Sequence, residues 1–403
     1  MNLAIAKPDY RIAGGCEGVL DRLADGLRGA GHDVAYVHVD ATGDPAARLP
    51  VAVPEPIWRQ FPEFFNHAGL ALAFEDLDLS SFDAVLSTQP PSYAVRHPRH
   101  LNLFFHHLKV CYDLEGVAAR CGQYPPDLLR LGAEIVREID RAYLTPDLQI
   151  LANSERTRWR LRQFNGLEAN VAVLYAGLDD DYLGYSGPIA YEDALCVGRH
   201  EFPKRPELFV HAMKHVSGLR GRVVGAGGRS EALRRIDVLL THDHASGGPE
   251  PDDADLWQRL CFEADDLDVT GLERALAARG LDSNIAFTGR LGRAALVREF
   301  ANAACVVCPA YEEDFGLTCI EAFAFGKPVV ACVDGGGYAE LIADGVDGFL
   351  VEPTGKAIAE AVSRFADRGL AREMGLRGRE KARTFTWDRA VSQLSSKLAE
   401  VCA

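Results

Sequence analysis

Residues 312–331 read EEDFGLTCIEAFAFGKPVVA, and within this stretch Glu313 and Glu321 stand eight positions apart. The turn segment FGLT at 315–318 lies between them, and the breaker GKP at 326–328 separates a helical pattern from an apolar strand. A glutamate on a loop and another in the first turn of the next helix can face one pocket, together with the N–H groups of the helix start. Carboxylates suit sugar hydroxyls and bare N–H groups suit phosphates, which is the combination that a nucleotide-sugar site needs.

The size and composition of the chain restrict its class. Its 403 residues are too many for one ordinary core, which suggests two domains. A formal net charge of −15 argues against a nucleic-acid partner, because such binding needs a basic face. No segment approaches the roughly 18 apolar residues of a transmembrane segment, and the start MNLAIAKPDY lacks the apolar core of a signal peptide.

The ten cysteines are dilute and irregularly spaced, unlike a disulfide framework. Cys305 and Cys308 form a C-x-x-C, but they lie in the apolar run AACVVCPA, which is typical of a buried strand. We therefore expect a reducing, cytoplasmic location.

Apolar runs alternate with helical patterns along most of the chain, which indicates parallel βαβ units. The alternation predicts an α/β protein with two Rossmann-like, doubly wound domains at residues 1–178 and 179–385, followed by an amphipathic helix at 386–403. The runs of the first half are LAIAKP, DVAYVHV, FDAVLSTQ, HLNLFFHH and DLQILANS, and those of the second are ALCVGR, RGRVVGA, IAFTGR, ACVVCPA, PVVACV and GFLVEP.

In each predicted domain, one pair of candidate residues follows the first strand. Arg199 ends ALCVGR and Lys204 comes five positions later, so two cations flank a strand-to-helix loop and can grip a diphosphate, unless the loop is simply a solvated basic one. Gly14 and Gly15 follow LAIAKP, where the absence of side chains permits a close backbone approach or merely a tight turn. Glu17, in the same segment, can cap the helix.

Other polar residues are open to more than one interpretation. His106 and His107 come just beyond a buried-looking strand, and either could serve chemistry or structure. The acidic run at 179–181 is interpreted as a turn at the hinge rather than a metal site. The run at 242–244, HDH, lacks further ligands of recognisable spacing and is interpreted as a polar loop. Within the long, polar segment 230–282, SGGPEPDDAD at 246–255 predicts an exposed loop.

The stretch 312–331 and the segment GRHEFPK at 198–204 resemble the donor-site motifs of retaining glycosyltransferases of family 4, which have the GT-B fold. The resemblance implies a transferase that uses a nucleoside-diphosphate sugar in a cleft between the two domains, with the last helix crossing back to the first domain. It implies that Arg199 and Lys204 stabilise the leaving diphosphate, that Glu321 binds the ribose and that Glu313 binds the sugar. No metal is required in this family.

The same resemblance assigns roles to further residues. It implies that the loop at Gly14 and Gly15 approaches the donor phosphates and the acceptor, and that His106 or His107 lies near the transferred sugar. Arg205 stands where the family often has a glycine, and we expect it to be exposed. The remaining implied donor contacts are the base-binding segment Gly289, Arg290 and Leu291, and the motif residues Phe315, Gly316, Leu317 and Thr318.

Three rival functions share this architecture. A GT-B epimerase would carry acid and base groups where the histidines stand, and a phosphorylase would need a cofactor-bearing lysine that the sequence does not reveal. A non-catalytic sugar-nucleotide binder would have a degenerate site, whereas Arg199, Lys204, Glu313 and Glu321 are all present. Among acceptors, a small soluble molecule is favoured over a lipid-linked one.

Overall fold

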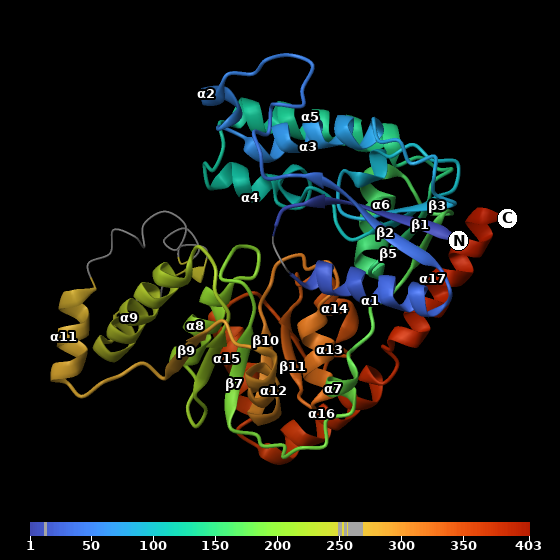
Figure 1. The fold of residues 1–403 in the computed structure, drawn as a ribbon. Coiled ribbons are helices and arrows are strands. Elements are labelled where there is room, and N and C mark those ends of the chain that lie inside the picture. Colours follow the sequence, from blue (N-terminus) through green and yellow to red (C-terminus); the bar gives the residue numbers. More distant parts are fainter. Residues whose placement is uncertain (12–13, 249–251, 254–255, 257–268) are drawn as a thin grey trace. The chain divides into compact units, whose positions relative to one another are not determined.

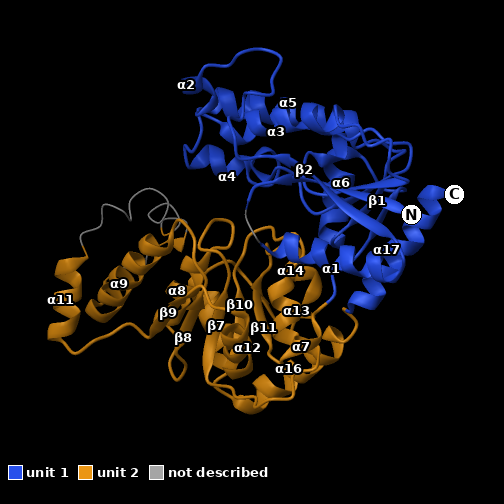
Figure 2. Ribbon diagram, in the orientation of Figure 1, with its two compact units in different colours: residues 1–177, 386–403 blue, residues 178–385 orange. Residues whose placement is uncertain are grey.

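The computed structural model describes residues 1–11, 14–248, 252–253, 256 and 269–403 (Figure 1). The chain divides into two compact units (Figure 2). Unit 1 comprises Met1–Gly177 and Thr386–Ala403, and unit 2 comprises Leu178–Phe385. Among the described residues each unit has a six-stranded parallel sheet with helices around it, which confirms the predicted pair of Rossmann-like domains.

Unit 1 is built on a sheet with the strand order β2-β1-β3-β4-β5-β6. Its central strands β3 and β4 are mostly apolar and almost wholly buried, because helices cover both faces of a parallel sheet. The strands are β1 (Asn2–Asp9), β2 (Asp33–Asp40), β3 (Ala84–Ser87), β4 (His100–Phe104), β5 (Gln149–Ala152) and β6 (Val171–Val173). The helices are α1 (Gly15–Gly29), α2 (Glu55–Trp58), α3 (Pro62–Glu75), η1 (Ser92–Ala94), η2 (Lys109–Cys111), α4 (Glu115–Arg120), α5 (Pro126–Tyr143), α6 (Glu155–Asn165) and α17 (Trp387–Cys402).

Helix α17 packs within unit 1 against α1. The contact is close, since a Cβ at Gly26 would lie 2.2 Å from a methyl group of Val391. Gln393 also donates a hydrogen bond to the carbonyl of Val173 over 2.6 Å. The amphipathic end of the chain therefore completes unit 1.

Unit 2 is built on a sheet with the order β12-β11-β10-β7-β8-β9. Its main core lies on the sheet face that α8, α9 and α15 cover. The strands are β7 (Asp193–Val197), β8 (Gly221–Val224), β9 (Ile285–Gly289), β10 (Ala303–Cys308), β11 (Val329–Cys332) and β12 (Gly348–Val351). The helices are α7 (Asp180–Leu183), α8 (Pro206–Lys214), α9 (Ser230–Ser246), α11 (Thr270–Ala278), α12 (Arg293–Asn302), α13 (Leu317–Ala324), α14 (Gly337–Leu341), α15 (Gly355–Arg364) and α16 (Arg368–Ala382).

The strand order of unit 2 reverses direction between β7 and β10. The chain runs from β7 outward through β8 to β9, then returns to the other side of β7 and runs outward again from β10 to β12. In open parallel sheets ligands bind at the carboxyl ends of the strands beside such a switch point. The topology therefore predicts a ligand site at the loops that follow β7 and β10.

The structure of unit 2 tests two of the sequence-based predictions. Cys305 and Cys308 lie on the fully buried strand β10, as predicted. The prediction of a polar loop for the HDH run at 242–244 is wrong: the run lies in α9, because the buried residues Leu233, Ile236 and Leu240 continue a helical apolar pattern up to it. Ser246 ends α9, and residues 249–251 and 254–255 of the predicted loop 246–255 lie outside the described residues.

Candidate functional site

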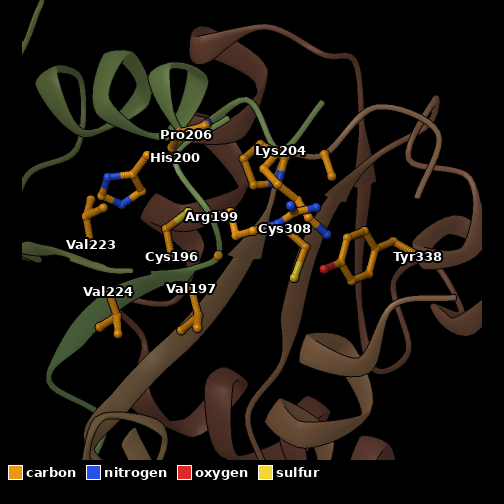
Figure 3. A pocket seen from close by; sticks show the side chains of 13 residues that line it. Cys196, Val197, Arg199, His200, Lys204, Pro206, Val223, Val224, Cys308 and Tyr338 are labelled. Carbon is orange, nitrogen blue, oxygen red and sulfur yellow. The ribbon is translucent and has the colours of Figure 1, made fainter. Parts of the chain in front are cut away.

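The carboxyl edge of the unit 2 sheet brings together the predicted phosphate-binding and sugar-binding residues. Arg199 and Lys204 belong to the loop between β7 and α8, and Glu313 belongs to the loop between β10 and α13. Lys204 Nζ lies 2.5 Å from Glu313 Oε2, and both side chains are largely shielded, with 24% and 17% of their surface exposed. Arg199 is exposed, and with Lys204 it lines a pocket at the switch point (Figure 3).

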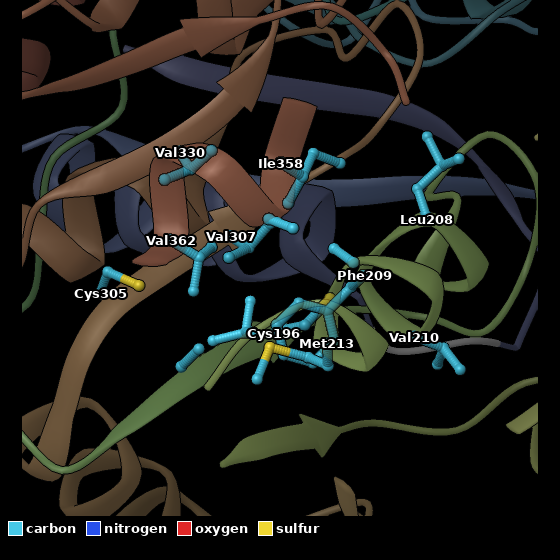
Figure 4. Packing of buried hydrophobic residues seen from close by; sticks show 14 of the residues in the cluster. Cys196, Leu208, Phe209, Val210, Met213, Cys305, Val307, Val330, Ile358 and Val362 are labelled. Atoms are coloured by element: carbon cyan, nitrogen blue, oxygen red, sulfur yellow. The ribbon is translucent and has the colours of Figure 1, made fainter. Parts of the chain in front are cut away.

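The floor of this pocket is held by the core of unit 2. Cys196 on β7 and Cys308 on β10 line the pocket from adjacent strands. On the core face, Phe209 and Met213 of α8 pack in the same buried cluster as Cys196 (Figure 4). Burial of these apolar groups fixes β7, and with it the starting point of the loop that carries Arg199 and Lys204.

The start of helix α13 depends on a glycine. Gly316 has φ +109°, a left-handed conformation that L side chains rarely adopt, and an added Cβ would lie 2.6 Å from the ring of Tyr338. The residues of the segment differ in exposure: Phe315 is buried with its ring 6.1 Å from that of Phe385, whereas Leu317 and Thr318 are half-buried. Phe315 is thus a packing residue. The turn at Gly316 sets the direction of the N–H groups at the start of α13.

Glu321 lies in the second turn of α13, not in the first turn as predicted, because the helix already begins at Leu317. Burial raises the pKa of Glu321 to about 7, an effect that nearby Arg293 opposes and Asp179 reinforces. Glu321 therefore stands where its charge is sensitive to pH near neutrality.

Arg293 was not singled out from the sequence, yet it organises the surroundings of Glu321. Its guanidinium lies 2.7 Å from Asp179 and 2.5 Å from Asp181, so the acidic run at 179–181 is paired with a cation. The run begins the short helix α7 rather than forming an irregular turn. The only available signal was the position of Arg293 at the first residue of α12, since the pairing joins segments more than one hundred residues apart.

Gly289, Arg290 and Leu291 lie at the end of β9, at the same edge of the sheet. Gly289 has φ +70°, and its carbonyl accepts a hydrogen bond from the N–H of Gly225 over 2.9 Å. Arg290 is exposed and Leu291 half-buried, so their backbone follows the rim of this edge. The structure brings this segment to the edge that carries Arg199 and Lys204.

Arg205 is not exposed, contrary to expectation. Only 11% of its side chain is accessible, and it pairs with Asp334 from the loop after β11. The sequence-based expectation was wrong because a charged residue beside Lys204 was assumed to be solvated, whereas its partner lies 129 positions away in the chain.

In unit 1, Gly14 and Gly15 follow β1 and begin α1. Gly14 is the N-cap residue with extended backbone, and no side chain caps this helix. Glu17 makes other contacts instead. Its Oε1 lies 3.6 Å from Lys7 Nζ and accepts a hydrogen bond from Gln89 Nε2 over 3.0 Å. Glu17 therefore links α1 to β1 and to the segment after β3.

The structure distinguishes the two adjacent histidines after β4. His107 is 1% exposed, its Nε2 lies 2.8 Å from Asn165 Oδ1, and burial lowers its pKa to about 4. Its ring packs against Phe104, Tyr112 and Phe164. His106 is half-buried, with Nδ1 2.8 Å from the carbonyl oxygen of His107. His107 is thus a core residue, and His106 is the one that a ligand can reach.

Two absences hold for the described residues. In that part of the chain, no group of three or more His, Cys, Asp or Glu side chains is arranged to hold a metal ion. Likewise, none of the described helices is both long and apolar enough to cross a membrane.

Comparison with known families gives two matches along the chain. Residues 13–182 match the model described as "Glycosyltransferase Family 4", and residues 265–382 match "Glycosyl transferases group 1". The two models together cover parts of both units.

Curated relatives carry the name D-inositol 3-phosphate glycosyltransferase. The protein of Streptomyces griseus is 41% identical over 126 residues, 30% of this chain and 26% of that protein. The protein of Mycolicibacterium smegmatis is 28% identical over 301 residues, 70% of this chain and 58% of that protein. The chain thus spans less than two thirds of the length of these relatives.

Solved structures resemble the chain over nearly its whole length. The sucrose-phosphate synthase of Thermosynechococcus elongatus superimposes with a TM-score of 0.65 at 19% identity, covering 99% of this chain and 98% of that one. WaaG, a glycosyltransferase involved in lipopolysaccharide biosynthesis, gives a TM-score of 0.63 at 16% identity and covers 98% and 99%. At such identities the likeness supports the fold.

Proposed function

The chain belongs to glycosyltransferase family 4 and has the two Rossmann-like domains of the GT-B fold, and on that premise we propose that it transfers a sugar from a nucleoside-diphosphate sugar to a small soluble acceptor. We further propose that the anomeric configuration is retained. The observation that carries the proposal is the contact of Lys204 with Glu313 at the switch point of unit 2, beside the exposed Arg199.

The chemistry follows from these side chains. Arg199 and Lys204 supply fixed positive charge where the leaving diphosphate develops negative charge, which is the electrostatic stabilisation that lowers a barrier most. Glu313, in contact with Lys204, accepts hydrogen bonds from sugar hydroxyls. Glu321, in the second turn of the following helix α13, accepts hydrogen bonds from the ribose. In this scheme the leaving phosphate oxygen takes the proton of the acceptor hydroxyl, so no glycosidase-like carboxylate pair is needed.

We assign the acceptor side to unit 1, with Gly14, Gly15 and His106 at the ends of β1 and β4. Of the two histidines, His106 takes the role because His107 is enclosed in the core. The names of the curated relatives, D-inositol 3-phosphate glycosyltransferases, support a small soluble acceptor. The described cysteines are all free thiols, which supports a reducing, cytoplasmic location.

A thermal-shift screen of nucleotides tests the donor assignment. A ligand that binds only the folded state stabilises it by about 2.7 kcal/mol at one hundred times its Kd. We expect at least one nucleoside diphosphate to raise the melting temperature more than its monophosphate does, since Arg199 and Lys204 are placed for the second phosphate. Equal shifts with both, or no shift with any nucleotide, would contradict the assignment.

The affinity for the nucleoside diphosphate should depend on pH through Glu321. Burial raises the pKa of Glu321 to about 7, so its carboxyl is protonated below that pH and charged above it. The charged form accepts the stronger hydrogen bonds, and affinity should therefore increase as pH rises from 6 to 8. The ligand's terminal phosphate also ionises near pH 6, and Glu321→Gln serves as the control because it keeps only that contribution. Parallel pH profiles of the two proteins would exclude this role of Glu321.

A further inference from the structure

Arg205 connects three loops at the carboxyl edge of the unit 2 sheet. From the loop after β7 its guanidinium forms a two-pronged contact with Asp334, in the loop after β11, over 2.9 and 2.6 Å. It also donates to the carbonyl oxygens of Pro309 over 2.7 Å and Ala310 over 3.2 Å, in the loop after β10. All five N–H groups of an arginine are fixed in one plane, so such a fork sets orientation as well as distance.

The backbone of Arg205 has a conformation that is unusual for an arginine. Arg205 has φ +46° and ψ +46°, the left-handed conformation that glycine adopts freely and other residues adopt at a cost. Such conformations persist where the surrounding structure holds them, and they cluster at functional sites. A glycine here would relieve the backbone, but it could not form the four hydrogen bonds of the Arg205 guanidinium.

The loops that Arg205 holds are those that carry Lys204 and Glu313. Arg205 directly follows Lys204 in the chain, and the N–H of Tyr311, just beyond the held carbonyls, donates to Pro203 over 2.7 Å. On the other side, the N–H groups of Glu312 and Glu313 donate to the carbonyls of Asp334 and Gly335 over 2.9 and 3.2 Å. The loop after β10 is thereby bonded to the loop of Arg205 on one side and to the loop of Asp334 on the other.

We propose that Arg205 is a positioning residue of the donor site. By holding Asp334 and the carbonyls of Pro309 and Ala310, it fixes the separation of the Lys204 cation from the Glu313 carboxylate. Lys204 and Glu313 touch the substrate in the proposed function, on which this inference rests, and Arg205 acts through them. A shift of about 1 Å in such groups is enough to cost roughly a hundredfold in rate.

The variants separate this role from general stability. Arg205→Gly removes the guanidinium and relaxes the backbone, and Asp334→Asn removes the partner charge. Arg222→Ala is the matched control, since Arg222 forms the same kind of fork with Glu299 over 2.5 and 2.6 Å in the same unit. Arg222 lies near the amino end of β8, at the opposite edge of the sheet from Lys204.

Hydrogen exchange tests the physical part of the proposal without any substrate. The amides of Tyr311, Glu312 and Glu313 should exchange at least tenfold faster in Arg205→Gly and in Asp334→Asn than in the unmodified protein. They should be unaffected in Arg222→Ala, in which faster amide exchange should be confined to β8 and α12. Unchanged exchange of residues 311–313 in Arg205→Gly would overturn the proposal.

Kinetics test whether Arg205 acts through Lys204. Arg205→Gly should lower turnover by roughly 10- to 100-fold in the unmodified background, and it should cause a clearly smaller further loss in a Lys204→Ala background, where only the position of Glu313 still depends on it. Losses that multiply would show an independent, merely structural effect and overturn the proposal. Hydrogen exchange is measured without a donor, so it tests the positioning role of Arg205 even if the unmodified protein transfers no sugar. Absence of transfer by the unmodified protein would contradict the proposed function alone.

Discussion

Lys204→Ala is expected to lower turnover by roughly 100- to 1,000-fold, the range for deleting one preorganised electrostatic contact. Lys204 lines the switch-point pocket, and its ammonium group contacts only Glu313 among the ion pairs of the described residues. A diphosphate that leaves without this cation has only Arg199 to compensate its developing charge. The fold should persist, because a partly exposed pocket lysine contributes little to the core.

The control for this prediction is Lys356→Ala, at an exposed lysine on α15 of the same unit. Turnover should be unchanged in that variant. Circular dichroism and the melting temperature must first show that Lys204→Ala is folded. Turnover like that of the unmodified protein, in a folded Lys204→Ala variant, would remove the lysine from the catalytic machinery.

Glu313→Gln is expected to reduce transfer by an amount comparable to the lysine change, while the affinity for the nucleoside diphosphate stays nearly intact. Glu313 is assigned to the sugar, which the diphosphate lacks. Its carboxylate also contacts the Lys204 ammonium group, so neutralising Glu313 leaves that cation free for phosphate rather than weakening it. Glu321→Gln should do the opposite: each charge-assisted hydrogen bond contributes about 1.5–3 kcal/mol, so nucleotide binding itself should weaken.

Calorimetric titration of both glutamine variants with the nucleoside diphosphate separates the two roles. The expected outcome is normal affinity for Glu313→Gln and affinity lower by roughly tenfold or more for Glu321→Gln. Normal affinity in both would exclude a ribose contact for Glu321. Equal loss in both would show that the two glutamates do not divide the donor as proposed.

The α/β class and the series of strands were predictable, because parallel strands that are covered on both faces occur in the sequence as separate apolar runs. The proximity of Lys204 and Glu313, 109 positions apart, could be expected only from the family resemblance. Once the strand order is known, the same proximity follows from physics, since β7 and β10 are neighbours and their carboxyl ends share one edge.

Other features of the site could not be predicted because they depend on distant partners. Arg205 was expected in solvent, and only the position of Asp334 across the edge of the sheet makes it a buried contact. The role of Arg293 is unpredictable for the same reason, as its partners Asp179 and Asp181 belong to a different segment. The choice between His106 and His107 required the packing of Asn165 and the aromatic rings around His107.

The helix start of α13 illustrates a limit of local patterns. The motif predicted a carboxylate in the first helical turn, but the left-handed Gly316 already ends the loop, and Glu321 falls one turn later. The chemistry proposed for Glu321 survives this correction, because its raised pKa and the nearby Arg293 still set it apart from a solvated surface glutamate.

Product analysis tests the central claim most directly. The unmodified protein is incubated, in the presence of excess EDTA, with the sugar form of the nucleotide found by thermal shift and with a panel of sugar phosphates and polyol phosphates. Nuclear magnetic resonance then gives the anomeric configuration of the product. We predict transfer that persists under chelation, requires an acceptor and retains the configuration of the donor. An inverted product, conversion of the donor without an acceptor, or activity that only an added divalent metal restores would contradict the account.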